Sequence, residues 1–214
     1  MRLETKICGI TTPETLAAAA AHGARYIGLN FYPKSPRYVG PAVAAQLARR
    51  APTGVRTVGL FVSPDDELLD SVLSQVPLDM IQLHGDETPE RVAEIRRNVS
   101  MPVMKAIRIA GDEDLDQVPA FEAAADRLLF DTKLPKNVAT LPGGNGVAFD
   151  WTLLANREWS KPWMLSGGLN ADNLAEAIRT TGATAVDTSS GVEDRPGNKT
   201  PALIRDFLTQ AAQL

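Results

Sequence analysis

The chain has 214 residues, and 44% of them are apolar, which is enough for one sizeable core and outside the range of disordered proteins. Its 22 Lys and Arg face 26 Asp and Glu, for a formal net charge of −4, so no nucleic-acid surface is expected. No apolar run reaches the roughly 20 residues of a membrane helix, and no apolar signal segment opens the chain. We therefore expect a cytoplasmic globular protein with no membrane contact.

Short β-rich runs alternate with helical runs, and the pair occurs eight times along the chain. We expect strands at Leu3–Cys8, Tyr26–Phe31, Arg56–Val62, Met80–His84, Val103–Ile109, Arg127–Asp131, Pro162–Ser166 and Ala185–Ser189. We expect helices to begin near Pro13, Pro41, Asp65, Thr88, Asp112, Asp150, Asp172 and Thr200. The mean spacing of roughly 27 residues is typical of a βαβ repeat. Eight units without a dividing linker predict a single-domain (β/α)8 TIM barrel over residues 1–214.

Strand parity predicts which side chains point into such a barrel, because alternate residues of each strand face the lumen. In the fourth strand, Gln82 and His84 share the polar face. In the first strand, Lys6 and Cys8 do the same, and Asp131 ends the sixth strand. These side chains all lie toward the carboxyl ends of their strands, which is where barrel active sites are built.

Cys8 and Asp131 are the candidate proton-transfer groups. A thiol has an ordinary pKa of about 8.5, so a base role needs a cationic or polar setting that favours the thiolate. Lys6 and Arg37 are candidates to supply that setting. A partly buried carboxyl at a barrel rim can have a raised pKa and donate a proton. The simpler interpretations are a buried structural thiol and a carboxylate that caps a turn.

Two glycine-containing turns follow the seventh and eighth strands, and both suit a phosphate group. The residues concerned are Gly167, Gly168, Ser189, Ser190 and Gly191. Backbone amides of these two loops form the recurring phosphate site of (β/α)8 barrels. The alternative is that the glycines only permit tight turns.

Three further features bear on the site. Arg37 lies in a loop stiffened by Pro33 and Pro36, which makes it a candidate bidentate clamp for a carboxylate, although most loop arginines are only solvated. Cys8 is the single cysteine, and no Cys and His cluster has metal-ligand spacing, so we expect no metal site. The long segment Thr132–Val147 is a candidate mobile lid.

These segments together resemble the phosphoribosylanthranilate isomerases of tryptophan biosynthesis, in the family's order and over almost the whole chain. The resemblance is carried by Lys6–Thr11, Phe31–Val39, Gln82–Glu87, Gly143–Gly146 with Phe149–Trp151, Leu165–Asn170 and Ser189–Glu193. The chain departs from the family's usual residues at Asn145, Thr188 and Thr200, and none of these is a proton-transfer candidate.

The resemblance implies an Amadori rearrangement of N-(5-phosphoribosyl)anthranilate to the corresponding 1-deoxyribulose 5-phosphate, without a metal or cofactor. It implies that Asp131 is the general acid that opens the ribose ring and that Cys8 is the base that removes the C2 proton. Arg37 resembles the arginine that holds the anthranilate carboxylate.

The remaining implied roles concern binding of the substrate. The phosphate-binding turns of the family match Gly167, Gly168, Ser189, Ser190 and Gly191. Asp187 is expected to contact the sugar or to order the loop after the eighth strand. Gln82 and His84 are expected to line the substrate site.

Two alternatives remain open from the sequence. One is the related isomerase of histidine biosynthesis, whose substrate carries two phosphates; Cys8 and the single visible phosphate site count against it. The other is a non-catalytic barrel that binds phosphosugars or a partner protein, for which neither Cys8 nor Asp131 would be needed. The expected ligand is therefore a small phosphosugar-anthranilate, with the chain acting as a monomer or a homodimer.

Overall fold

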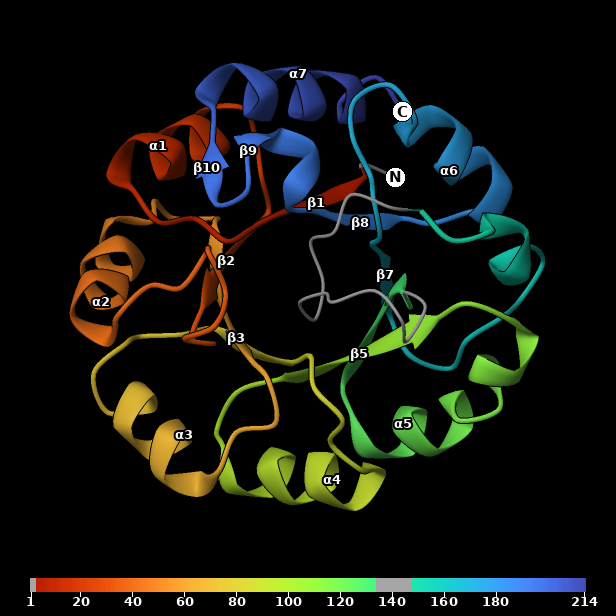
Figure 1. The fold of residues 1–214 in the computed structure, drawn as a ribbon, viewed down its shortest axis with the longest axis horizontal. Coiled ribbons are helices and arrows are strands. Elements are labelled where there is room, and N and C mark those ends of the chain that lie inside the picture. Colours follow the sequence, from red (N-terminus) through yellow and green to blue (C-terminus); the bar gives the residue numbers. More distant parts are fainter. Residues whose placement is uncertain (1–2, 134–147) are drawn as a thin grey trace.

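The computed structural model describes residues 3–133 and 148–214, and within them parallel strands form a closed barrel in chain order (Figure 1). The barrel strands are β1 (Glu4–Cys8), β2 (Tyr26–Asn30), β3 (Arg56–Phe61), β4 (Met80–Leu83), β5 (Val103–Ile109), β6 (Arg127–Thr132), β7 (Trp163–Leu165) and β8 (Ala185–Thr188). The barrel closes where β8 pairs with β1, with Glu4 opposite Ala185 and Ile7 opposite Thr188. The predicted (β/α)8 barrel is confirmed.

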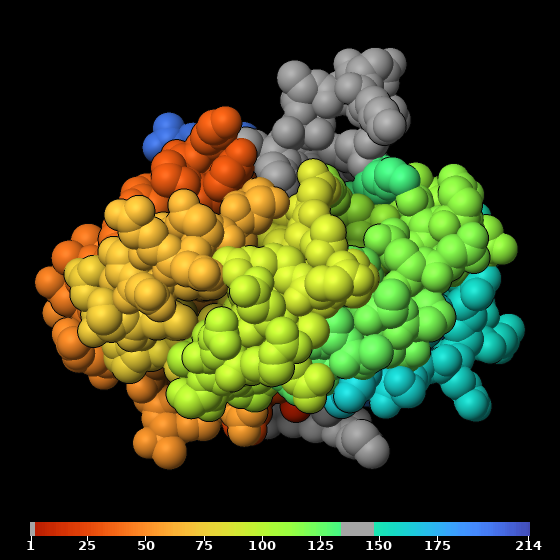
Figure 2. Space-filling view, turned by 90° about the horizontal axis from the view of Figure 1, so that it is seen from below, coloured from red at the N-terminus to blue at the C-terminus, as the bar shows by residue number. Residues whose placement is uncertain are grey.

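An outer layer of helices surrounds the strands. In the described ranges the α-helices are α1 (Pro13–Ala21), α2 (Pro41–Arg50), α3 (Asp66–Leu73), α4 (Pro89–Asn98), α5 (Val118–Ala124), α6 (Leu174–Thr181) and α7 (Pro201–Ala211). Figure 2 shows one side of this layer, where α2 to α5 follow one another around the molecule. None of these helices is both long and apolar enough to cross a membrane.

Three helices begin with the same local signal, a threonine followed by proline in the first turn. The side chains of Thr12, Thr88 and Thr200 each accept a hydrogen bond from a backbone N–H three residues later. Proline fits this position because the first helical N–H has no partner within the helix. These starts lie within one residue of the predicted ones.

Two predicted helices are shorter than expected. The helix predicted from Asp150 is only the 3-10 helix η2 (Trp151–Leu154), and the chain leaves it through Asn156, whose backbone is left-handed (φ 56°). The connection after β5 begins with the 3-10 helix η1 (Asp112–Leu115), and α5 forms only beyond it, with Pro119 in its first turn.

The segment after β8 is more ordered than predicted. A 3-10 helix, η3 (Ser190–Val192), leads into a small antiparallel hairpin of β9 (Glu193–Arg195) and β10 (Asn198–Lys199), where the sequence predicted only a loop. The candidate lid, Thr132–Val147, falls almost entirely outside the described residues.

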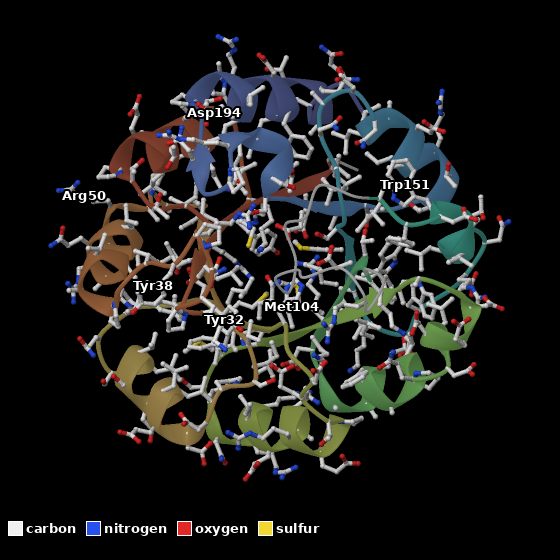
Figure 3. All side chains as sticks on the ribbon, viewed as in Figure 1. Tyr32, Tyr38, Arg50, Met104, Trp151 and Asp194 are labelled. Carbon is white, nitrogen blue, oxygen red and sulfur yellow. The ribbon has the colours of Figure 1, made fainter. Side chains whose placement is uncertain are left out.

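Strand parity divides the side chains into an outer and an inner set, as predicted. Outward residues such as Ile7, Ile81 and Leu83 are buried against the helices. The inner apolar layer consists of Tyr26, Val58, Met80, Met104, Ala106, Leu129, Met164 and Ala185. Figure 3 shows Met104 inside the ring of strands. On one side of this layer, Lys6, Gln82 and Asp131 lie toward the carboxyl ends of their strands, and on the other Arg127 pairs with Glu4 at the amino ends.

Candidate active site

A row of three hydrogen-bonded side chains joins β4 to β6. His84 Nε2 lies 2.9 Å from Asp131 Oδ2, and His84 Nδ1 lies 2.9 Å from Gln82 Nε2. Asp131 Oδ1 also accepts the backbone N–H of Thr132 at 2.9 Å. Because the Gln82 amide nitrogen can only donate, Nδ1 accepts and the proton of a neutral His84 sits on Nε2, facing the carboxylate.

The amide oxygen of Gln82 has no such partner. It is buried and makes no hydrogen bond within the described part of the chain. Turning the amide over would place this oxygen on His84 Nδ1, which would then carry the proton and leave Nε2 as an acceptor. In that arrangement the 2.9 Å contact between His84 Nε2 and Asp131 Oδ2 requires a proton between the two atoms.

A buried ion pair lies beside Cys8, on β1 and β8. Lys6 Nζ donates to Asp187 Oδ1 at 3.0 Å, and Lys6 has no exposed surface. Burial raises the pKa of the Cys8 thiol above its ordinary value, while the Lys6 ammonium lowers it and the Asp187 carboxylate raises it further. Ser166 Oγ donates to the second Asp187 oxygen at 3.4 Å.

Arg37 is held by a carboxylate of the β9–β10 hairpin. Its Nε and Nη2 donate to the two oxygens of Glu193, each at 2.8 Å. Lys199 Nζ donates to the same carboxylate at 2.7 Å and to the Ser189 carbonyl at 3.1 Å. Although burial raises the pKa of Glu193, Arg37 and Lys199 lower it below the ordinary value. Glu193 is therefore a carboxylate between two buried cations.

The turns after β7 and β8 form one small cavity. It is lined by Asp131, Thr132, Ser166, Gly167, Gly168, Leu169, Asp187, Thr188, Ser189 and Ser190. Gly167 and Gly168 have positive φ angles of 89° and 67°, which favour glycine. Gly191 does not line the cavity; it allows two backbones to touch, since a Cβ there would lie 2.0 Å from the Leu169 carbonyl oxygen.

A second buried ion pair orders the loop that follows β4. Lys105 Nζ, from β5, donates to Glu87 Oε2 at 2.6 Å and to the Gly85 carbonyl at 2.8 Å. Glu87 accepts in turn from the backbone N–H groups of Gly85 and Ser63. The pair fixes the segment that begins directly after His84.

The predicted residues thus fall into connected groups rather than one cluster. Asp131, His84 and Gln82 form the first group, and Cys8 and Asp187 share the second through Lys6. Asp131 and Asp187 both line the cavity between the two turns. Arg37 pairs with Glu193.

Sequence reasoning missed four residues of this region. Glu193 and Glu87 lie in segments that carry the family resemblance, but the sequence assigns no role to them, to Lys199 or to Lys105. The available signal was Lys105 inside the predicted strand Val103–Ile109, since lysine is almost never fully buried without a partner. In the described part of the chain, no group of His, Cys, Asp and Glu is arranged to hold a metal ion.

The fold and the site define a class of protein, a (β/α)8-barrel enzyme whose ionisable side chains meet at the carboxyl ends of the strands. The family model of N-(5'-phosphoribosyl)anthranilate (PRA) isomerase matches residues 5–210. The PRA isomerase of Rhodospirillum centenum is 66% identical over 214 residues, which cover 100% of both chains. The chain belongs to the N-(5'-phosphoribosyl)anthranilate isomerase family.

Solved structures agree with this family. The enzyme of Thermotoga maritima superposes with a TM-score of 0.88 at 35% identity, covering 99% of this chain and 100% of that one. Another solved structure is of monomers generated from the dimeric enzyme of Thermotoga maritima. A PRA isomerase in complex with reduced 1-(o-carboxyphenylamino)-1-deoxyribulose 5-phosphate has a TM-score of 0.84 at 34% identity, covering 99% and 100% of the two chains.

Proposed function

We propose that this chain isomerises N-(5'-phosphoribosyl)anthranilate to 1-(2-carboxyphenylamino)-1-deoxyribulose 5-phosphate, with Asp131 as general acid and Cys8 as general base. The observation that carries the proposal is the pair of turns that form one cavity beside Asp131 and Asp187, with Cys8 linked to Asp187 through Lys6. The family match over residues 5–210 supports the substrate.

The reaction begins with a proton from Asp131. Protonation of the ribose ring oxygen breaks the C1–O bond and leaves a cationic iminium between C1 and the anthranilate nitrogen. Asp131 needs a proton to give, and we assign to it the proton that lies between Asp131 and His84 Nε2 when the Gln82 amide is turned over. His84 and Gln82 therefore act on the substrate through Asp131 as well as lining its site.

The second proton transfer belongs to Cys8. The iminium charge acidifies the neighbouring C2–H bond, so a thiolate suffices to remove that proton. The product of this step is an enolamine, which tautomerises to the ketone. The proton ends on the Cys8 sulfur, and no oxidant, metal or cofactor enters the balance.

The two ends of the substrate are held by different elements. Arg37, directed by Glu193, is assigned to the anthranilate carboxylate, which suits a planar guanidinium. Backbone amides of the turns that contain Gly167, Gly168, Ser189 and Ser190 are assigned to the phosphate, with Gly191 keeping the two turns in contact. Asp187 lies between Lys6 and the cavity, where it is assigned to order the loop after β8 and to contact the sugar.

Two substitutions test the proton-transfer roles. With substrate generated in situ and its fluorescence followed, Cys8→Ala and Asp131→Asn should each lower kcat by at least about 10²-fold, because each removes one positioned proton-transfer group. Both should still bind the reduced product analogue, which contains both recognition groups. Asp70→Asn, an exposed change on α3, is the matched control and should keep wild-type turnover.

Three outcomes would count against the proposal. Full turnover by Cys8→Ala would remove the thiol from the mechanism while leaving the isomerase. Loss of analogue binding in both folded variants would assign the two residues to binding instead. Conversion of no PRA by the wild type would redirect the search to the histidine-pathway substrate.

The assembly state is a separate prediction. The Thermotoga maritima relative is described as dimeric, and we predict a monomer or a homodimer for this chain. Sedimentation equilibrium distinguishes the two, and a larger assembly would contradict the prediction.

A further inference from the structure

Lys6 is a fully buried cation that the mechanism above does not use. It lies in β1 with no exposed surface, on the inner face that also carries Cys8. Its ammonium donates to Asp187 Oδ1 at 3.0 Å. Burying such a pair costs solvation, and replacing one with apolar side chains of similar volume is often neutral or stabilising. An apolar side chain at position 6 could join the inner apolar layer of the barrel. The stability of the fold therefore does not explain why this position carries a lysine.

The sulfur of Cys8 and the ammonium of Lys6 converge on one point above the backbone of Gly28, in β2. A Cβ built at Gly28 would lie 2.9 Å from Cys8 Sγ and 3.2 Å from Lys6 Nζ. Even an alanine would therefore press against both groups, and glycine leaves the room in which they meet. The structure places a permanent cation next to the sulfur that is assigned the proton.

The charges around Cys8 oppose one another. Burial, and after it Asp187, raise the pKa of the thiol, whereas Lys6 lowers it and Lys199, from β10, does so more weakly. Burial lowers the pKa of Lys6, but Asp187 and Cys8 outweigh this effect, so the net pKa lies above the ordinary value. Lys6 is therefore protonated wherever the enzyme works. Asp187 itself also interacts electrostatically with Asp131 on β6 and with His84, which follows β4.

We propose that Lys6 is a positioning residue for the isomerisation, whose ammonium, shared between Asp187 and Cys8 above Gly28, stabilises the Cys8 thiolate that removes the C2 proton. This inference rests on the proposed function of Cys8. Lys6 stays protonated throughout; the C2–H bond breaks, its proton joins sulfur, and its electrons enter the enolamine. Asp187 competes for the same ammonium, so the two neighbours of Cys8 act in opposite directions.

A thiolate titration tests this directly, because Cys8 is the only cysteine. The ultraviolet absorbance of each variant is followed against pH, and the absorbance of its own Cys8→Ala derivative is subtracted, which removes the contribution of the tyrosines. Lys6→Met should raise the pKa of Cys8 by about 1–3 pH units, the usual effect of losing a close opposite charge. Lys6→Arg should restore much of the wild-type value, and Asp187→Asn should lower the pKa.

The kinetic readout has the same sign. Since the wild-type pKa is raised, the thiolate fraction and kcat/KM should increase as pH rises from neutral toward that pKa. In Lys6→Met this rising limb should move to higher pH by the same 1–3 units or so. At a fixed pH below both pKa values, kcat/KM should fall at least about tenfold, the factor for one pH unit.

A pair of double variants protects the test from a folding defect. Lys6→Met leaves Asp187 buried without its cation, which can destabilise the fold. Lys6→Met/Asp187→Asn removes both charges together. This double variant should still raise the pKa of Cys8, although by less than Lys6→Met alone. Lys105→Met/Glu87→Gln removes another buried lysine pair and is the matched control, with no change expected at Cys8.

An unchanged Cys8 pKa in folded Lys6→Met or its double variant would overturn the inference. A fall in the pKa with Lys6→Met, or a rise with Asp187→Asn, would do the same. The proposed role of Cys8 survives these results if Cys8→Ala remains inactive, so the two failures are distinguishable.

Discussion

At the scale of single residues, Glu193 holds the guanidinium of Arg37, the group proposed to bind the anthranilate carboxylate. The Glu193 carboxylate accepts hydrogen bonds from two nitrogens of Arg37, each at 2.8 Å, and these two bonds fix the plane of the guanidinium. The same carboxylate neutralises Lys199, so one acidic residue holds two cations beneath the hairpin. Removing the charge of Glu193 would leave both cations buried without their anion, which is the costly way to break a buried pair.

Glu193→Gln should therefore weaken substrate binding more than it slows the chemistry. We expect KM to increase about tenfold, equivalent to about 1.4 kcal/mol of binding free energy, with kcat changed by less. Asp194→Asn, on the same hairpin but exposed, is the control and should leave KM unchanged. Steady-state kinetics measure both constants. An equal fall in kcat at constant KM would show that Glu193 serves the proton transfers instead.

Parity predicted the inward side chains but not their partners. The inner positions of Lys6, Cys8, Gln82 and His84 follow from alternation along single strands, which is local information. The pairing of Lys6 with Asp187 spans 181 residues and exists only because the barrel closes. The Arg37–Glu193 pair spans 156 residues in the same way, so a lone sequence does not specify which cation meets which anion.

At the scale of elements, the loop after β4 is tied to β5 rather than to its own helix. Lys105 reaches across from β5 to Glu87 and the Gly85 carbonyl, and the backbone of Ser63 completes the ring of donors. Burial lowers the pKa of Lys105, which the Glu87 carboxylate opposes. This arrangement holds the position at which β4 delivers His84.

Lys105→Met should destabilise the protein by about 3–5 kcal/mol, because Glu87 would remain buried without its cation. The double variant Lys105→Met/Glu87→Gln should recover most of this loss, since neither charge is then left alone. Urea denaturation measures the free energy of unfolding of both. If the double variant were as unstable as the single one, packing of the lysine stem rather than charge would be responsible.

The elements themselves were predictable where local signals are strong. Thr-Pro pairs mark helix starts because both residues suit the first turn whatever surrounds them. The hairpin of β9 and β10 was not predicted, because its order comes from Glu193 and Lys199 being buried against Arg37 and Ser189. The length of the helix expected from Asp150 was overestimated. No sequence pattern before Asn156 indicates that its backbone is left-handed and that η2 ends there.

At the scale of the whole molecule, the first and last strands complete a single sheet. β8 pairs with β1, and α7 packs beside α1, so residues from both ends of the described chain share one barrel (Figure 1). The apolar residues between strands and helices form one continuous cluster around that barrel. A closed sheet has no free edge at which part of it could separate. We therefore propose that residues 1–214 unfold as a single domain.

Leu69→Ala tests this proposal from the side of the barrel away from the tryptophans. Leu69 is buried in α3, whereas Trp151 lies across the ring (Figure 3), and Trp159 and Trp163 pack on Phe130. The cavity should cost about 2–5 kcal/mol. Because one cluster joins the two sides, the urea midpoints from tryptophan fluorescence and from circular dichroism should fall equally.

The control for this prediction lies in the same helix, α3. Asp70→Ala changes the exposed neighbour of Leu69 and should move neither midpoint by more than a small amount, as surface changes usually stay within about 0.5 kcal/mol. If Leu69→Ala lowered the midpoint seen by circular dichroism but not that seen by fluorescence, the two halves of the barrel would unfold separately. The chain would then contain two folding units inside one closed sheet.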